Sequence, residues 1–229
     1  GTYSLRRNII LGSRISLVGA GIDLTILEFN STASSVQITG TNRSVGGTEV
    51  TATEGSTSVT GVGTTFTNAR TGDFIHIWQG GHHYISEISS ITNNTTLVLV
   101  DAWPFPTATS ATIYLVFDPA KNSAVKDLTI KNSDDTTASL QITRAVNFVA
   151  HNVTVYSNGG AGGNGIQLDT VFDSEFRNVR SDFHNDDGWQ IVDIAKTSFY
   201  NCSATGNGGQ GWDLASVGNS DQLGFYSCL

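Results

Sequence analysis

Several residue types are scarce in this 229-residue chain. It has no methionine, two cysteines and three prolines, and only 14% of its residues are charged. Two cysteines are too few for a disulfide-built scaffold, and the charge content is lower than that of disordered chains. No apolar run approaches the roughly 18 residues of a membrane-spanning helix, so we predict no membrane span. Because the chain begins at Gly1 and lacks methionine, we expect a trimmed or processed piece.

The formal net charge of −8 argues against nucleic acid as a partner, since phosphates reward lysine and arginine. It leaves neutral glycans, cationic ligands and Ca²⁺ as ligand classes, and acidity also keeps a protein soluble. The 25 glycines, with abundant serine, threonine and asparagine, favour many short strands joined by tight turns.

A repeat occupies residues 120–229 and recurs every 23 to 26 residues in two tracks. The first track is Val125–Ile130, Ala150–Val155, Phe176–Ser181, Phe199–Ala204 and Phe225–Cys228. The second track is Ser139–Ile142, Gly165–Leu168, Gly188–Ile191 and Gly211–Leu214. Apolar residues alternate within each track, as in strands, and no helical spacing is present. Strands too short to bury their own faces must stack on the next repeat. The sequence therefore predicts an all-β, right-handed, single-stranded parallel β-helix with three short strands in each coil.

One polar position lies between the apolar pairs of the first track and holds Asp127, Asn152, Asn178, Asn201 and Ser227. Stacked amides at a bend can hydrogen-bond from coil to coil, and asparagine tolerates the left-handed backbone of a sharp bend. This pattern resembles the asparagine ladder of the pectate-lyase-like β-helix superfamily, over roughly residues 1–45 and 117–229. In that superfamily a cap helix usually precedes the first coil. Its absence here predicts a fragment, or a partner that covers the coil edge.

The period is interrupted between residues 46 and 116. Alternating segments such as Gly72–Trp78 and His83–Ile91, separated by glycine and asparagine turns, predict a small antiparallel barrel or sandwich. The segment resembles a module that recurs in phage tail fibres and tailspikes. We therefore expect first coils in 1–45, an inserted module in 46–116 and later coils in 117–229.

Outward side chains of stacked coils form columns about 4.8 Å apart, which allows a face to be predicted. The expected columns are Lys126, His151, Arg177, Tyr200, Tyr226, then Thr129, Thr154, Arg180, Ser203, then Lys131, Tyr156, Asp182, Thr205. Tyrosine rings stack on sugars, arginine and lysine bind carboxylates, and a lyase needs a cation beside a base. Our catalytic candidates are His151, Arg177, Arg180, Tyr200 and Asp182, and our substrate-binding candidates are Lys126, Tyr156, Tyr226 and His184. The alternative is an ordinary solvated sheet.

The bend at residues 182–188 is rich in carboxylates, including Asp186 and Asp187. Such oxygens suit Ca²⁺, and paired carboxylates suit a glycosidase, but Asp-Asp-Gly is also a common turn. We predict no cofactor other than Ca²⁺ at this bend. His76, His82 and His83 favour a turn region over a metal site, because adjacent residues of a strand point to opposite faces.

Cys202 and Cys228 share one inward column, where we expect free thiols in preference to a disulfide. Trp189 and Trp212 have inward parity and are expected in the core.

The resemblance, the module and the tyrosine, arginine and histidine face together favour an extracellular polysaccharide-binding or polysaccharide-degrading β-helix. It would be tailspike-like, or a secreted lyase, hydrolase or epimerase, although no specific catalytic signature of lyases or epimerases is present. One alternative is a non-catalytic structural or adhesive segment of a virion or cell surface, elongated and homotrimeric. Another is a glycan-binding module without turnover. Each places the protein outside the cell, at its surface or on a virion.

Overall fold

The computed structural model describes residues 1–30, 35–133, 137–158, 163–215 and 223–229. The chain forms two compact units, one of Gly1–Thr39 with Ala120–Leu229 and one of Gly40–Pro119. The first unit is a parallel β-helix and the second an antiparallel sheet, so the predicted all-β class is confirmed. Among the described residues, no helix has the length and apolarity to cross a membrane.

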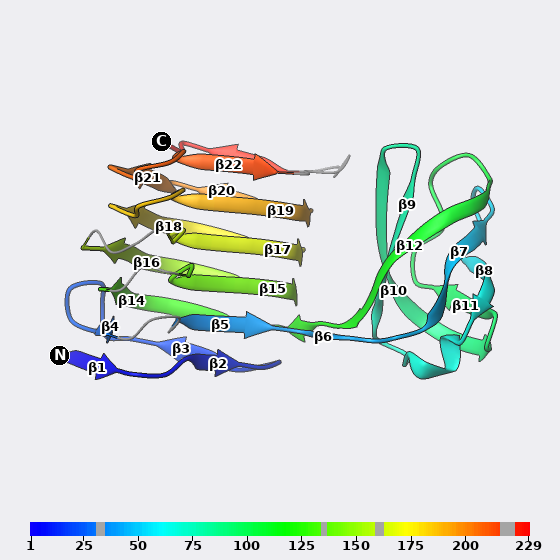
Figure 1. Cartoon of the computed structure of the whole chain (residues 1–229), viewed down its shortest axis with the longest axis horizontal. Coiled ribbons are helices and arrows are strands. Elements are labelled where there is room, and N and C mark those ends of the chain that lie inside the picture. The colour runs from blue at the N-terminus through cyan, green and yellow to red at the C-terminus, as the bar shows by residue number, and fades with distance from the viewer. Residues whose placement is uncertain (31–34, 134–136, 159–162, 216–222) are drawn as a thin grey trace. The chain divides into compact units, whose positions relative to one another are not determined.

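Two parallel sheets build the β-helix, and successive coils add strands to each (Figure 1). The first sheet contains β1 (Thr2–Leu5), β3 (Ser16–Val18), β4 (Ile26–Phe29), β14 (Ala124–Asn132), β16 (Val149–Ser157), β18 (Glu175–Asp182), β20 (Ser198–Tyr200), β21 (Ser203–Thr205) and β23 (Gly224–Tyr226). The second sheet contains β2 (Ile9–Leu11), β5 (Val36–Thr39), β13 (Ala120–Lys121), β15 (Leu140–Val146), β17 (Ile166–Phe172), β19 (Trp189–Ala195) and β22 (Trp212–Ala215).

The polar bend position interrupts the pairing of the first sheet without ending its longer strands. Asp127 and Asn152 drop out of the β14–β16 register, while the residues on either side of them pair. All five residues of this position have a left-handed backbone, with φ between 50 and 55°. Asn152 Nδ2 donates to Asp127 Oδ1 at 2.9 Å, and Asn178 Nδ2 donates to Asn152 Oδ1 at 3.1 Å. Strands such as β16 therefore bend and continue, where the sequence predicted separate short strands.

Stacked rings fill the interior of the β-helix. Phe176 and Phe199 stack with centroids 5.0 Å apart, and Trp189 and Trp212 stack at 4.6 Å and 7°. Phe176, Phe199 and Trp189 are fully buried, which confirms the inward position predicted for the tryptophan. In-register stacking places like side chains directly above one another, so each coil buries its apolar face against the next.

The second unit lies between β5 and β13 in the chain. Its strands are β6 (Thr41–Asn42), β7 (Gly46–Ala52), β8 (Ser58–Thr64), β9 (Phe74–Gln79), β10 (His82–Asn93), β11 (Thr96–Leu99) and β12 (Ala108–Asp118), with a 3-10 turn at Phe66–Asn68. The order is β6-β12-β7-β8-β11-β10-β9, and β12 also pairs with β9. The sheet thus closes on itself, around a core that includes the fully buried Trp103 and Phe66.

Candidate functional site

The outward face of the first sheet contains the predicted columns in register. His151 pairs with Lys126 and Arg177, and Tyr200 pairs with Arg177 and Tyr226. The other two columns form in the same register, with Thr154 beside Arg180 and Tyr156 beside Asp182. Thr129, predicted to face outward, is buried, because its hydroxyl donates to the carbonyl of Ile22 in a loop that covers it. Because every coil repeats the same strand register, residues that are 23 to 26 positions apart in the sequence become neighbours on this face.

Arg177 and Tyr200 make the closest contacts of the first column. The Arg177 guanidinium lies 4.3 Å from the Tyr200 ring centroid, and the Tyr200 and Tyr226 rings stack at 4.7 Å and 10°. Arg177 also binds Glu175 through two hydrogen bonds, Nε to Oε1 at 3.2 Å and Nη2 to Oε2 at 3.1 Å. These bonds raise the pKa of Arg177. Its guanidinium group is therefore already paired with a carboxylate of the same strand.

The other cations near the third column are also paired. Arg180 Nη2 lies 2.8 Å from Asp182 Oδ2, and Lys131 Nζ lies 2.6 Å from Glu28 Oε1. The hydrogen bond from Glu28 raises the pKa of Lys131. Asp182 is 5% exposed at its side chain, whereas the sequence predicted an open outward position. Its Oδ1 is buried and accepts no hydrogen bond.

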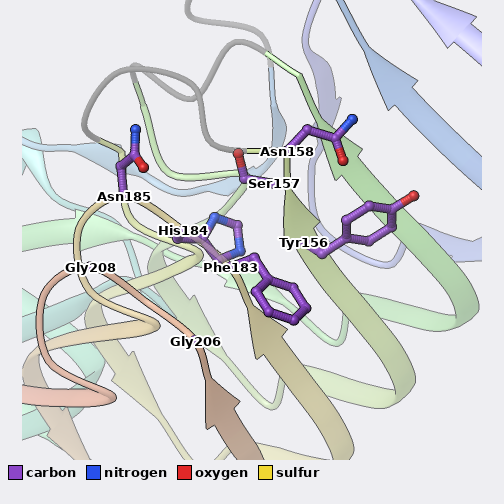
Figure 2. Close-up of a pocket in the computed structure, with 8 residues that line it drawn as sticks. All are labelled: Tyr156, Ser157, Asn158, Phe183, His184, Asn185, Gly206 and Gly208. Carbon is purple, nitrogen blue, oxygen red and sulfur yellow. The ribbon is translucent and has the colours of Figure 1, made fainter.

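A pocket of about 600 Å³ lies at the ends of β16, β18 and β21. Figure 2 shows the rings of Tyr156 and Phe183 projecting from the ribbon, with the His184 ring between the Phe183 and Ser157 side chains. The full lining is Tyr156, Ser157, Asn158, Phe183, His184, Asn185, Gly206 and Gly208. The described lining is therefore aromatic and neutral polar, and it contains no carboxylate, lysine or arginine.

Phe183 is held in an unusual position. Its side chain is exposed, at 58%, and its backbone is left-handed, with φ of 60°. A bulky residue in this region is an outlier that costs on the order of 1 kcal/mol or more, so the surrounding structure must enforce it. Two features do so. The Phe183 amide donates to Thr205 O at 2.9 Å, and the ring lies over Gly206, where an added Cβ would stand 2.7 Å from ring carbons.

His184 is a predicted binding residue that the structure places in the pocket but buries, at 1% exposure. Its amide donates to Asn207 Oδ1 at 2.9 Å, and Asn207 Nδ2 donates to Ser181 O at 3.2 Å. Its ring Nε2 lies 3.4 Å from Val155 O. His184 therefore belongs to the floor of the pocket, whereas the half-buried Tyr156 and the exposed Phe183 form its walls.

Asp186 and Asp187, which follow the pocket residue Asn185, make hydrogen bonds that connect this turn to the turn of the next coil. Asp187 is 8% exposed, and its Oδ1 accepts a hydrogen bond from the Gln210 amide at 2.7 Å. Asp186 is exposed, and its carbonyl accepts from the Gly209 amide at 3.0 Å. Within the described ranges, no group of three or more histidine, cysteine or acidic side chains is arranged to hold a metal ion. Among those residues, Asp186 and Asp187 thus have no third histidine, cysteine or acidic side chain arranged with them, and the Ca²⁺ site stays a prediction.

Other reactive groups lie in the cores of the two units. Cys202 and Cys228 are free, as predicted. Burial raises the pKa of Cys202 to about 12, which keeps it a thiol. In the second unit, His76 Nε2 lies 2.8 Å from His83 Nδ1, and burial lowers the pKa of His76 to about 3.

The structure thus brings together Lys126, His151, Arg177, Tyr200 and Tyr226 in one column, and places Tyr156 and His184 in a pocket at the opposite edge of the face. Sequence reasoning missed Phe183, Asn158 and Asn185. The available signal was a single large apolar residue in the polar bend 182–188, next to a column that already contained Tyr156. It also missed the ion pairs of Arg177 and Arg180, although residues two apart on a strand share a face.

No protein-family model matches this chain, and no curated protein matches it. Solved structures of phage tailspikes do match. The tailspike protein gp49 from Pseudomonas phage LKA1 has a TM-score of 0.62 and 16% identity, over 87% of this chain and 36% of that chain. The Pseudomonas phage phi297 tailspike gp61 has a TM-score of 0.62 and 14% identity, over 99% of this chain and 41% of that chain.

A third match is the gp54 tailspike of Acinetobacter baumannii bacteriophage AP22, solved in complex with A. baumannii capsular saccharide. It has a TM-score of 0.47 and 12% identity, over 99% of this chain and 45% of that chain. This chain therefore spans between 36% and 45% of the length of the three tailspikes. At the identities of the first two, the likeness shows a shared fold.

Proposed function

We propose that this chain is a polysaccharide-binding β-helix, part of a tailspike-like protein that acts on a virion or outside the cell. The observation that carries this proposal is the pocket wall formed by Tyr156 and Phe183. The Phe183 ring is exposed to solvent at the edge of the pocket, where it is available to stack on a ligand. Aromatic faces stack on the apolar faces of sugar rings, while amides such as Asn185 bond the hydroxyls.

The surroundings of the pocket favour binding over cleavage. A glycosidase needs two carboxylates about the scissile bond, and a lyase needs a cation and a base free to act on the substrate. The described pocket lining has no carboxylate, and Arg177 and Arg180 of the face are bound to Glu175 and Asp182. The candidates His151 and Tyr200 lie in the first column, about five residues along the strand from the third column that contains Tyr156, which is at most roughly 16 Å because the strand bends at Asn152.

A panel of bacterial surface polysaccharides tests the proposal. The whole chain is expected to bind one or more of them, and Phe183→Ala should weaken the bound complex roughly 5- to 30-fold. This corresponds to about 1–2 kcal/mol for the loss of an aromatic stacking contact. Tyr3→Ala provides the matched control, because Tyr3 is an exposed aromatic, at 56%, on another strand of the same sheet.

The same incubations are examined for new reducing ends and for the ultraviolet absorbance of unsaturated sugars. Binding without either product supports the proposal as stated. Product formation would show a degrading enzyme instead. The catalytic candidates to substitute would then be His151, Arg177, Arg180, Tyr200 and Asp182. If no polysaccharide binds, the proposal fails, and the result favours the alternative of a non-catalytic structural or adhesive segment.

A further inference from the structure

Three cations of the candidate face, Lys131, Arg177 and Arg180, are already paired with carboxylates of the protein itself. Lys131 is paired with Glu28 from the adjacent strand, and Arg180 is paired with Asp182 on its own strand. Arg177 makes two parallel hydrogen bonds to Glu175, the geometry with which arginine would otherwise grip a carboxylate on a ligand. An acidic sugar that approached these side chains would have to displace an intramolecular carboxylate that is tethered nearby.

The remaining lysine of the face is far from the pocket. Lys126 belongs to the first column and Lys131 to the third, so they are five residues apart on β14. At about 3.3 Å per residue this is at most roughly 16 Å, since β14 bends at Asp127, against a screening length of about 8 Å at physiological salt. Lys126 therefore contributes little to the potential at Tyr156.

Carboxylates are closer to the pocket than free cations are. Asp186 and Asp187 follow Asn185 in the same loop, whereas the charge of Asp182, just before Phe183, is balanced by Arg180. Asp186 is exposed, and the whole chain carries a net charge of −8. A cleft lined by one sign of charge concentrates ligands of the opposite sign and repels its own. The electrostatics here disfavour carboxylate, sulfate and phosphate groups on the ligand.

The polar groups that do line the pocket are neutral. Asn158 and Asn185 are exposed, and the amide group of each contains both a donor and an acceptor. Such groups match sugar hydroxyls and acetamido groups, which also both donate and accept. The Tyr156 and Phe183 rings suit the C–H face of a pyranose, or the methyl group of an N-acetyl substituent.

From these observations we infer that the pocket at Tyr156 and Phe183 takes an uncharged sugar, a hexose or an N-acetylhexosamine, and that acidic residues of a polysaccharide are excluded from it. The inference rests on the proposed polysaccharide-binding function and specifies its ligand. It departs from the sequence-based hypothesis that Arg177 and Arg180 bind uronate carboxylates.

The test uses the whole chain and a panel of neutral, N-acetylated and uronate-containing polysaccharides. Each acidic polymer is presented twice, native and after its carboxylates have been reduced to alcohols, so that backbone and linkage are matched. We expect binding to neutral or reduced polymers, with affinity that changes less than about twofold when the salt concentration is raised, since no charges are neutralised. Binding to a native acidic polymer that is lost on reduction, or that weakens steeply with salt, overturns the inference and leaves the proposed function standing. Failure to bind any polymer, reduced or native, overturns the proposed function and removes the inference with it.

A second test removes the carboxylate that pairs with Arg180 and measures the affinity for acidic polymers. Asp182→Asn keeps the side-chain volume and removes the charge that balances Arg180, so the variant should gain up to about fivefold affinity for native acidic polymers, the worth of a solvent-exposed ion pair. Glu49→Gln, an exposed substitution in the second unit, changes the net charge equally and should leave this affinity unchanged. Equal gains in the two variants would show that net charge, not the pairing of Arg180, decides the preference. If neither variant gains affinity while neutral binding persists in both, the ion pair is not what excludes acidic sugars, and the inference fails.

Discussion

Acidification should weaken the second unit through a single buried histidine. His76 on β9 is fully buried, its Nδ1 accepts or donates no hydrogen bond, and its Nε2 lies 2.8 Å from His83 Nδ1 on β10. Burial, and then the charge of His83, lower its pKa from 6.5 to about 3. Between these values the unfolded chain binds a proton that the folded unit rejects. Stability is therefore intact above about pH 6.5 and is lost as the pH falls toward 3.

The size of the loss follows from the same values. One pH unit inside this window corresponds to about 1.36 kcal/mol, so lowering the pH by about 1.5 units, to about 5, should cost about 2 kcal/mol. Amide hydrogen exchange, corrected for the intrinsic rate at each pH, measures the free energy of opening of β9 and β10 directly.

His76→Phe keeps an aromatic ring at the site and removes the titration. It should lose some stability at every pH, because His83 loses a hydrogen-bond partner, but its free energy of opening should vary with pH by about 2 kcal/mol less than that of the parent. His151→Gln, in the other unit, is the control and should keep the parental slope. A slope that survives in His76→Phe would show that another group drives the acid response, and would refute the reasoning.

Three further outcomes are expected. Asn152→Ala should lower the free energy of unfolding by about 1–3 kcal/mol in urea titrations, because it breaks two inter-coil hydrogen bonds and places alanine at φ of 53°, while Asn152→Gly should recover the backbone part of this loss. Arg43→Ala should destabilise the second unit by about 1–3 kcal/mol in thermal unfolding, because it leaves Asp73, with a side chain 4% exposed, without its cation; an unchanged melting temperature would contradict this. Cys202 should resist alkylation in the folded protein and react once urea is added, as followed by mass spectrometry, since burial raises its pKa to about 12; equal labelling in both states would disprove its protection.

The β-helix and its columns were predictable because two local rules suffice. A period near 24 residues fixes which coil follows which, and strand alternation fixes which side chains point outward. His151 beside Arg177, and Trp189 above Trp212, follow from these rules alone. The left-handed bend at Asn152 was predictable for the same reason, because the residue type and its place in the repeat agree.

The pocket was not predictable in this way. Phe183 and Gly206 directly follow the paired Asp182 and Thr205, so the 23-residue period does place one above the other. The period does not predict that the Phe183 ring is exposed, or that a pocket opens between this loop and the end of β16. The burial of His184 depends on Asn207, 23 residues later, which holds the His184 amide. Sequence spacing predicts which loop residues are neighbours in successive coils, but not how deeply their side chains are buried or whether a pocket opens beside them.

The sequence by itself determined the repeat, the register and the sign of every charge on the face, because these depend on period and alternation. Only the tertiary structure decided whether those charges are available. The fork of Arg177 is bound by Glu175, and Arg180 is bound by Asp182, whose side chain is itself buried. Whether a charge is paired depends on distance and burial, which the period of the repeat does not encode. Because these cations are paired, the expected ligand is a neutral sugar at the edge of the face and not an acidic sugar at its centre.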